Sequence, residues 1–527
     1  MTRAAAAARV VQCEDTPAPE HGLLILAPLS VEAKAVRAGA PWAEVQRIGM
    51  GPRRAARSAQ VVGWDGAHRA PSQWAAILIA GFCGALDPEL EPGDVVLASE
   101  VRGPTGTSTC ADPAILAGVL RRGGMRVHVG PIASSQRLVL RERRRTLQRT
   151  GAIAVDMESA WLAPAAQGKP LVVLRVVLDT ERHELLRPAR TVLGAATAYR
   201  ALRRACALVG EWAQALAERE VVLASPRASC AGVDRAVQIV ERALEEHGPP
   251  VYVRKQIVHN AHVIAELERR GAVFVQELDE VPRGATVIFS AHGVSPTVRE
   301  QASRLGLEVI DATCPLVAKV HAEARRFSAQ QMDIVLVGHE DHEEIEGTKG
   351  EAPERTHVIS TVEEVADLAV RDPERVAYLT QTTLAVDETA TVVDALRERF
   401  PSLRGPAASD ICYATQNRQD AVRALASDCD LVLVVGSPNS SNSRRLVEVA
   451  ERAGCPAMLI DDASQIPPER LVAARRIGLT AGASAPEALV DGVVRALQGI
   501  GGAMVSERTV ATEDIHFKLP AGLRGEN

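Results

Sequence analysis

The strongest constraint on this chain is the recurrence of three isolated cysteines, each placed where a helix is expected to begin. Cys230, Cys314 and Cys412 are followed by AGVDRAVQIVERALEE, PLVAKVHAEARRF and YATQNRQDAVRALA. Apolar residues recur in these stretches at helical spacing. The intervals between the cysteines are each long enough for one small α/β unit. Three such units around a common axis would bring three thiolates to one centre.

The number and spacing of all the cysteines limit the kinds of metal site and disulfide that the chain can form. The chain has nine cysteines and no CxxC pair, so a local zinc ribbon or ferredoxin-type cluster run is excluded. An odd count argues against a disulfide framework. Free cysteine is often simply buried, and we assign that inert role to Cys429 and Cys455. The amides of a helix N-terminus lower the pKa of a thiol, which favours a ligand role for the other three.

Length and composition indicate a multidomain α/β protein. The chain has 527 residues, and throughout it short β-branched runs alternate with amphipathic helical stretches. A net charge of −6 and an aromatic content of 3% favour no nucleic-acid partner. The longest apolar runs are of strand length, so we expect no membrane span and a cytoplasmic protein.

Two domains are expected. In the first half, strands are predicted at 23–26, 76–80, 95–98 and 171–177, and a long helix over 196–217. A charged run at 218–220 precedes a further strand at 221–224. We therefore expect a disordered N-terminus over 1–21, a first domain over 22–218 and a second domain over 219–527.

Polar residues of the second half follow apolar strand runs, where α/β folds place their sites. His259, His292 and His342 stand in such positions. GSPNSSNSRRL (436–446) and TAGASAP (480–486) are strand-to-helix turns rich in hydroxyl and backbone N–H groups, which suit a phosphate. Each feature alone is also explained by a structural histidine or a helix cap. Together they favour a cradle for a diphosphate.

From about residue 221 to 524 the chain resembles the 4-hydroxy-3-methylbut-2-enyl diphosphate reductases, the last enzymes of the non-mevalonate isoprenoid pathway. The motifs that carry the resemblance are CAGVDRA, VYVR, VHN, IFSAHGVS, DATCPLV, QTTL, DICYAT, GSPNSSNS and TAGASAP. The resemblance implies three pseudo-equivalent α/β units around a central 4Fe–4S cluster. It also implies reductive dehydroxylation of an allylic diphosphate to isopentenyl and dimethylallyl diphosphate, with electrons from a ferredoxin or flavodoxin.

The same resemblance assigns roles to residues of this chain. Cys230, Cys314 and Cys412 would hold the cluster, with one iron free of protein ligands. Glu344 would deliver a proton to the leaving hydroxyl group, and Thr382 would orient it. The diphosphate would be bound by His259, His292, His342, Ser440, Ser441, Asn442 and Ser484.

The chain departs from this family at two places. The family reads PRGFCAGV where Ala228 and Ser229 stand here, and HPE where Glu343 stands before Glu344. We expect replacement of Glu343 to matter little. The alternative is that the cysteines hold a structural zinc and the second half is a regulator.

The first half, roughly residues 22–217, resembles the purine nucleoside phosphorylase and methylthioadenosine nucleosidase superfamily. The stretches concerned are AGFCGALDPELEPGDVVLAS, AVDMES and LRVVLDT. The phosphorylase-like proteins of hopanoid biosynthesis are similar too. The resemblance implies a bifunctional enzyme acting on an adenosine-type nucleoside. Glu158 would grip the ribose hydroxyls, Asp179 would protonate the purine N7, and Glu32 would activate water. The alternative is a non-catalytic nucleoside-binding module.

Overall fold

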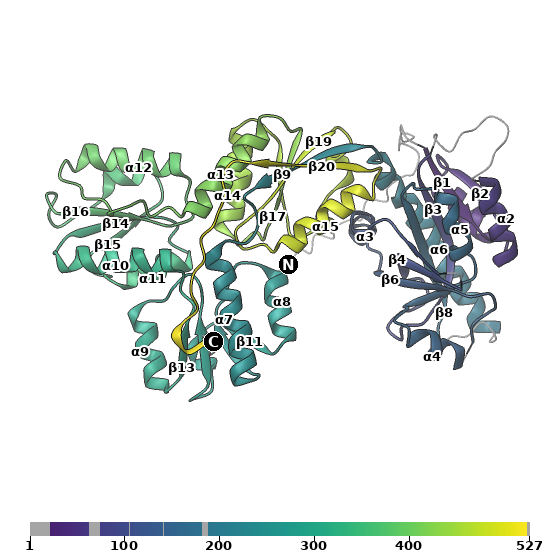
Figure 1. Cartoon of the computed structure of the whole chain (residues 1–527), viewed down its shortest axis with the longest axis horizontal. Coiled ribbons are helices and arrows are strands. Elements are labelled where there is room, and N and C mark those ends of the chain that lie inside the picture. Colours follow the sequence, from purple (N-terminus) through teal and green to yellow (C-terminus); the bar gives the residue numbers. More distant parts are fainter. Residues whose placement is uncertain (1–21, 63–73, 105, 141, 182–187, 524–527) are drawn as a thin grey trace, which may run out of the picture. The chain divides into compact units, whose positions relative to one another are not determined.

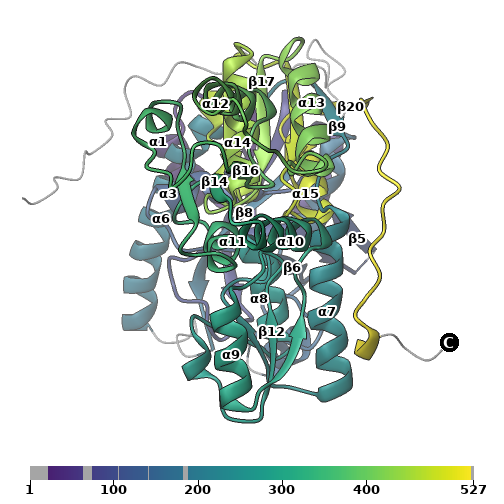
Figure 2. The same cartoon turned by 90° about the vertical axis from the view of Figure 1, so that its left-hand side faces the viewer.

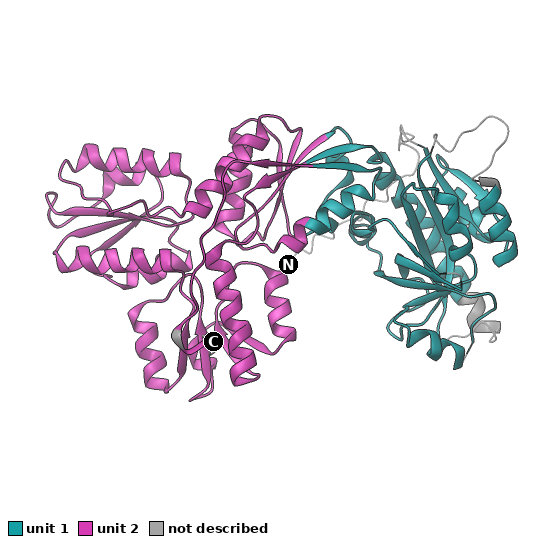
Figure 3. Cartoon of the chain, viewed as in Figure 1, with its two compact units in different colours: residues 1–221, 462–475, 491–505 teal, residues 222–461, 476–490, 506–527 magenta. Residues whose placement is uncertain are grey.

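The computed structural model describes residues 22–62, 74–104, 106–140, 142–181 and 188–523. The predicted disordered stretch, 1–21, lies outside these ranges. The chain forms two compact units, shown in different colours in Figure 3. Unit 1 contains residues 1–221, 462–475 and 491–505, and unit 2 contains residues 222–461, 476–490 and 506–527. The predicted boundary at residue 219 stays a prediction.

Unit 1 is built on an eight-stranded sheet of order β2-β1-β3-β7-β6-β4-β5, with β8 pairing both β3 and β4. Its elements are β1 Gly22–Ala27, α1 Ser30–Gly39, β2 Glu44–Arg47, α2 Pro52–Val62, β3 Trp74–Ala85, β4 Val95–Gly103, β5 Gly106–Thr109, α3 Ala114–Arg122, β6 Val127–Ser134, α4 Glu142–Gln148, β7 Ala154–Asp156, α5 Ser159–Leu162, a 3₁₀ turn Ala163–Ala166, β8 Leu171–Asp179 and α6 Pro188–Gln214.

The predicted strands of the first half lie within β1, β3, β4 and β8. Consecutive residues of β3, Ile77 to Ala80, are all buried, so the sheet is covered on both faces and its strands read as continuous apolar runs. The predicted helix over 196–217 corresponds to the second part of α6, which begins earlier, at Pro188, and ends at Gln214, three residues before the predicted end. Proline is favoured in the first turn of a helix because its missing N–H would have no partner there.

Unit 2 carries most of three further sheets (Figure 1). Their orders are β11-β10-β12-β13, β15-β14-β16 and β18-β17-β19-β9-β20. The elements are β9 Arg219–Ser225, α7 Ala231–His247, β10 Val251–Arg254, α8 Ala261–Arg269, β11 Ala272–Val275, β12 Thr286–Phe289, α9 Pro296–Leu305, β13 Glu308–Asp311, α10 Pro315–Ala329, β14 Asp333–Val337, α11 Glu343–Gly350, β15 Thr356–Ile359, β16 Val376–Thr380, α12 Val386–Arg399, α13 Tyr413–Ala426, β17 Leu431–Val435, α14 Ser441–Arg452, β18 Ala457–Ile460, β19 Arg476–Ala481, α15 Glu487–Gln498 and β20 Ala503–Thr509.

Short 3₁₀ turns complete the chain, and the last of them is η7, Ala521–Leu523. The others are Leu278–Glu280, Glu363–Asp367, Ala463–Gln465 and Pro468–Arg470. After β20 the chain runs extended, and its last described residues lie against α7, where Leu519 and Leu523 join the core of the β10 sheet (Figure 2). No helix in the described ranges is long and apolar enough to cross a membrane.

The strands that reach the centre of unit 2 are parallel within their sheets. β17 reads LVLVV and is buried throughout, as is β14, DIVLV. Because both strands are covered by helices on both faces, neither shows an alternation of polar and apolar residues. The predicted arrangement of three small α/β units is confirmed. The N-cap residues of α7, α10 and α13 are Cys230, Cys314 and Cys412, so each of the three small α/β units contributes one such helix.

Candidate active site

The C-terminal ends of the parallel strands of unit 2 converge on one cavity. The loops after β9 and β13 lead to Cys230 and Cys314, and the loop after α12 leads to Cys412. The loops after β10, β12 and β14 lead to the histidines, and Thr382 lies in the loop after β16. This is the end at which open α/β sheets place ligands. The cavity has a volume of about 110 Å³, and its lining includes every site residue predicted for the second half: Cys230, His259, His292, Cys314, His342, Glu344, Thr382, Cys412, Ser440, Ser441, Asn442 and Ser484.

The three thiols line this cavity from three directions. Each cysteine N–H donates to a carbonyl of a neighbouring loop: Cys230 to Ala483, Cys314 to Ala291 and Cys412 to Thr382, over 3.3, 3.0 and 3.0 Å. These bonds tie each thiol to a loop that also carries a polar site residue. The backbone therefore fixes the cysteines before any ligand is considered.

The three cysteines offer the thiolate donors that a 4Fe–4S cluster needs. A Cβ added to Gly232 would lie 2.7 Å from the sulfur of Cys314 and 3.8 Å from that of Cys230, so glycine keeps this wall of the cavity open. In the described ranges no three His, Cys, Asp or Glu side chains meet closely enough to hold one metal ion. A four-iron cluster instead binds thiolates at separate corners.

Burial dominates the electrostatics of two thiols. It raises the pKa of Cys314 to about 11 and that of Cys412 to about 12, although the amides at the starts of α10 and α13 act in the opposite direction. The helix N-termini lower these pKa values, as expected from the sequence, but burial outweighs them and the net shift is upward. Desolvation of a thiolate outweighs the helix amides in a buried loop.

Glu344 lies at the first turn of α11 and is 2% exposed. Its two carboxyl oxygens accept hydrogen bonds from the backbone N–H and the hydroxyl of Thr382, at 2.7 and 3.0 Å. Burial raises the pKa of Glu344 to about 7, and the bonds from Thr382 oppose that rise only in part. A carboxyl group with this pKa exchanges protons near neutrality, as a general acid must.

The three histidines form one cluster. The rings of His259 and His292 are stacked with centroids 4.2 Å apart, and His342 meets both edge-on at 5.7 and 5.8 Å. Burial, with the neighbouring imidazoles, lowers the pKa of His259 and of His342 to about 3. The backbone N–H of Glu344 donates to Nδ1 of His342 over 3.2 Å, so the proton of the neutral ring is on Nε2. His342 therefore offers a neutral N–H donor to an anion.

Glu343 is part of this cluster. Its carboxylate lies 3.1 Å from Nδ1 of His292, and both side chains are less than one fifth exposed. The pKa of Glu343 is lowered by its hydrogen bond to His292, despite burial. We expected Glu343 to matter little, but its contact with a predicted diphosphate ligand removes the basis for that expectation.

The turn before α14 is equipped for a phosphate. The hydroxyl of Ser440 accepts from the N–H of Ser443 and lies 3.3 Å from the hydroxyl of Ser484. Asn442 is 5% exposed, and neither polar atom of its side chain has a hydrogen-bond partner among the described residues. A buried amide without partners costs free energy unless a ligand supplies the bonds.

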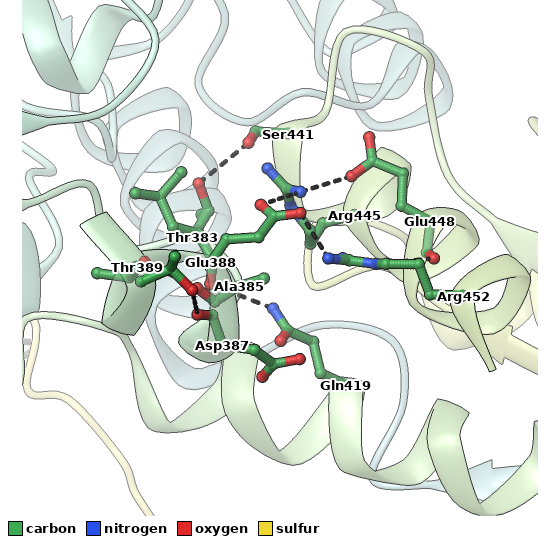
Figure 4. Close-up of polar contacts among 12 residues, drawn as sticks. Thr383, Ala385, Asp387, Glu388, Thr389, Gln419, Ser441, Arg445, Glu448 and Arg452 are labelled. Carbon is green, nitrogen blue, oxygen red and sulfur yellow. Dashed lines mark hydrogen bonds and ion pairs between the residues drawn. The ribbon is translucent and has the colours of Figure 1, made fainter. Parts of the chain in front are cut away.

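A network of polar side chains holds this turn in place (Figure 4). The hydroxyl of Thr383 donates to that of Ser441 over 3.2 Å, which joins the loop after β16 to the start of α14. Further along α12 and α14, the carboxylate of Glu388 accepts hydrogen bonds from Arg445 and Arg452, each at 2.5 Å. We did not predict these residues as site residues. The arginine pair in NSSNSRRL was the signal that could have indicated them.

A larger cavity of about 660 Å³ adjoins the predicted diphosphate site. Lys255, Arg444 and Arg445 contribute positive charge to its lining, and Asp341 and Glu448 contribute negative charge. His259, His342 and Ser441 line both cavities. The two cavities therefore adjoin.

The predicted residues of the first half lie in two places within unit 1. Glu32 accepts from the backbone N–H groups of Phe82 and Leu29, at 2.7 and 2.6 Å, and Glu158 accepts from that of Gly51 at 3.0 Å. Burial raises the pKa of both carboxyl groups, to about 7 for Glu32, while the fully buried Arg175 acts in the opposite direction on each. The guanidinium of Arg175 thus interacts electrostatically with both glutamates.

Asp179 lies apart from that pair, at the end of β8. Its carboxylate forms an ion pair with Arg144 of α4, and both side chains are almost fully buried. Arg144 also donates to the carbonyl of Ala85 over 2.8 Å. A cavity of about 40 Å³, lined in part by Asp156, adjoins them. Sequence reasoning missed Arg144, because RERRR offers several arginines and only the fold shows which one faces inward.

Unit 2 is an α/β fold in which three cysteines and the buried Glu344 line one pocket, an arrangement typical of a metal-cluster enzyme. Residues 221–498 match the family model of the LytB protein, more than half of the chain. The chain belongs to that family. Residues 43–213 match the model of the phosphorylase superfamily, which confirms the predicted kind of first domain.

Individual relatives match the second half closely. The 4-hydroxy-3-methylbut-2-enyl diphosphate reductase of Xanthomonas campestris pv. campestris (strain B100) is 57% identical over 310 residues, 58% of this chain and 98% of that protein. The reductase of Ralstonia nicotianae is 55% identical over 308 residues, 58% of this chain and 95% of that protein. The structure of the Plasmodium falciparum E-1-hydroxy-2-methyl-but-2-enyl-4-diphosphate reductase aligns with a TM-score of 0.56 at 37% identity, covering 58% of this chain and 97% of that one.

Proposed function

We propose that the second half of the chain reduces 4-hydroxy-3-methylbut-2-enyl diphosphate to isopentenyl and dimethylallyl diphosphate. The observation that carries this proposal is the buried Glu344–Thr382 pair in the same cavity as three cysteines and three histidines. The identity with reductases over almost their whole length supports it. The reaction replaces a C–O bond by C–H and consumes two electrons and two protons, with water as the second product.

The diphosphate is the part of the substrate that the protein binds. His342 offers its Nε2–H, and Asn442 offers the amide that has no hydrogen-bond partner among the described residues. The hydroxyls of Ser440, Ser441 and Ser484 and the N-terminal amides of α14 complete the cradle. His259 and His292 line the same cavity and add further N–H donors.

Glu344 supplies the proton with which the hydroxyl group leaves as water. Its pKa of about 7 leaves a substantial protonated fraction at neutral pH. Thr382 holds both carboxyl oxygens and so fixes the direction of the acid. Cys230, Cys314 and Cys412 would hold the 4Fe–4S cluster, which when bound supplies a Lewis-acidic iron and passes on electrons from a ferredoxin or flavodoxin.

Anaerobic turnover with a chemical reductant tests this proposal. The purified chain should convert the hydroxylated diphosphate to both products and should bind the substrate in the absence of reductant. Binding without turnover by a cluster-loaded protein would contradict it. A protein that is colourless and contains zinc would favour the alternative of a structural-zinc regulator.

For the first half we propose binding of an adenosine-type nucleoside and cleavage of its N-glycosidic bond. The match to the phosphorylase superfamily and the grouping of Glu32 and Glu158 at Arg175 support it. Glu158 would bind the ribose hydroxyls, Glu32 would activate water, and Asp179 would protonate the base. The ion pair with Arg144 opposes the last role, since a guanidinium stabilises the ionised carboxylate.

Release of free base from a panel of nucleosides, with and without phosphate, decides between catalysis and a non-catalytic binding module. Cleavage requires the Arg144–Asp179 pair to open when the nucleoside binds. Binding of one nucleoside without release of base from any would favour the binding module.

A further inference from the structure

Each of the three cysteine-capped helices carries a basic residue on its second turn. Arg235 follows Cys230 on α7, Lys319 follows Cys314 on α10, and Arg418 follows Cys412 on α13. Arg235 and Lys319 stand five residues after their cysteines and Arg418 stands six residues after its own, so the three have similar places in the three α/β units. None of them lines the cavity that holds the thiols.

Arg235 reaches from α7 to the loop that precedes the second cysteine. Its Nη1 donates to the carbonyls of Ala312 and Thr313, at 3.2 and 3.1 Å. Its Nε donates to the carbonyl of Lys518 in the C-terminal segment, at 2.9 Å. The helix behind Cys230 is thereby tied to the two residues just before Cys314.

Lys319 makes the equivalent connection from α10. Its Nζ donates to the carbonyls of Ala408 and Ser409, at 2.7 and 2.9 Å, and to the carboxylate of Asp410 at 3.2 Å. Asp410 in turn accepts from the backbone N–H of Thr380 at the end of β16. The helix behind Cys314 is thereby tied to the loop before Cys412.

Arg418 closes the series from α13. It is fully buried, and it donates to the carbonyl of Ala228 at 2.7 and 3.0 Å and to that of Ser229 at 3.2 Å. Glu513 of the C-terminal segment accepts from it at 3.1 Å. The helix behind Cys412 is thereby tied to the loop before Cys230.

The loop held by Arg418 is the one at which this chain departs from its family. Ala228 replaces glycine there and has a φ of 57°, in the left-handed region. A residue with a Cβ adopts that conformation only at a cost in free energy. The hydrogen bonds from Arg418 to Ala228 and Ser229 oppose the relaxation of this turn.

We propose that Arg235, Lys319 and Arg418 are positioning residues that form a closed ring around the three cysteines. Each ties the helix behind one thiol to the loop ahead of the next, so the ring sets the separations of the three sulfurs. The inference rests on the proposed function, because a fixed separation matters only where the thiols share one cluster. Residues beyond the ligands commonly control metal affinity in this way.

The rate of iron loss to a chelator tests the ring. Wild-type protein and the variants Arg235→Gln, Lys319→Gln and Arg418→Gln are purified anaerobically with cluster, and the visible absorbance is followed after addition of chelator. We expect iron loss to be roughly 10–100-fold faster in each variant. Arg235→Lys and Lys319→Arg, which keep a cation, should restore most of the wild-type retention.

Matched controls lie on the same three helices. Arg242→Gln, Arg326→Gln and Arg423→Gln remove arginines whose ion pairs are with Glu245, Glu323 and the aspartates 387 and 420. These control variants should lose iron at the wild-type rate.

Iron loss at the wild-type rate in the ring variants would overturn the proposal. Iron loss as fast in the control variants as in the ring variants would overturn it as well. Should Arg418→Gln fail to fold, the half-buried Arg235 and Lys319 decide the matter. A wild-type protein that binds no iron would overturn the proposed function itself, and the ring with it.

Discussion

Replacing Glu344 by glutamine separates proton transfer from binding. Glutamine has nearly the shape of the carboxyl group and can keep the hydrogen bond from the Thr382 backbone N–H, which is 2.7 Å long in the wild type. It cannot pass a proton to the leaving hydroxyl. Turnover should fall by roughly 10²–10⁴-fold, the usual contribution of a general acid, while substrate affinity changes little.

The same variant should be more stable than the wild type at alkaline pH. Burial raises the pKa of Glu344 from 4.5 to about 7. The folded state thus disfavours the ionised form, and the cost to folding grows as pH rises from 4.5 to about 7 and is constant above that. A shift of this size corresponds to about 3 kcal/mol. Glutamine carries no such cost, so the variant gains up to that amount at pH 8 and nothing below pH 4.5.

Two measurements check this prediction. Anaerobic turnover is compared with a binding titration, and the denaturant midpoint of unfolding is compared at pH 5 and pH 8. Wild-type turnover should also decline above about pH 7 as Glu344 ionises. Glu340→Gln, an exposed residue paired with Lys349, is the control. Undiminished turnover in Glu344→Gln would show that the proton comes from another group. If the variant gained no stability over the wild type between pH 5 and pH 8, the cost assigned to burying the ionised Glu344 would be refuted.

Three further predictions address other parts of the account. Serine in place of any one of the three cysteines at the helix starts should abolish reduction and release iron, whereas Cys429→Ser should leave both unchanged; the brown colour and iron content report the result. Glu343→Gln should raise KM for the diphosphate several-fold with a smaller effect on kcat, because its partner His292 is a predicted ligand. An unchanged KM would show that Glu343 does not contribute to substrate binding. In the full chain, Asp179→Asn should remove most of the release of free base from a nucleoside, and equal rates in variant and wild type would exclude Asp179 from the proposed chemistry.

The sequence was informative wherever the signal is local. The cysteines at helix starts and the hydroxyl-rich turns are contiguous motifs, so their places at strand ends could be predicted from periodicity and family resemblance. The ring was not predictable in this way. Arg235, Lys319 and Arg418 donate to carbonyls far away in sequence, and a carbonyl carries no mark of residue type.

Burial was the other quantity that the sequence did not provide. The thiols of Cys314 and Cys412 stand at helix N-termini as predicted, yet their pKa values are raised because the surrounding units exclude water. The pairing of Asp179 with Arg144 likewise depends on which side of a short helix faces the sheet. Both effects arise from packing between elements that are distant in the chain.

Iron and acid-labile sulfide per chain, measured on anaerobically purified wild-type protein, test the central claim most directly. The account predicts a brown protein with about four irons and four sulfides per chain. It also predicts loss of both in Cys314→Ser. A colourless wild-type protein that contains stoichiometric zinc and no sulfide would contradict it.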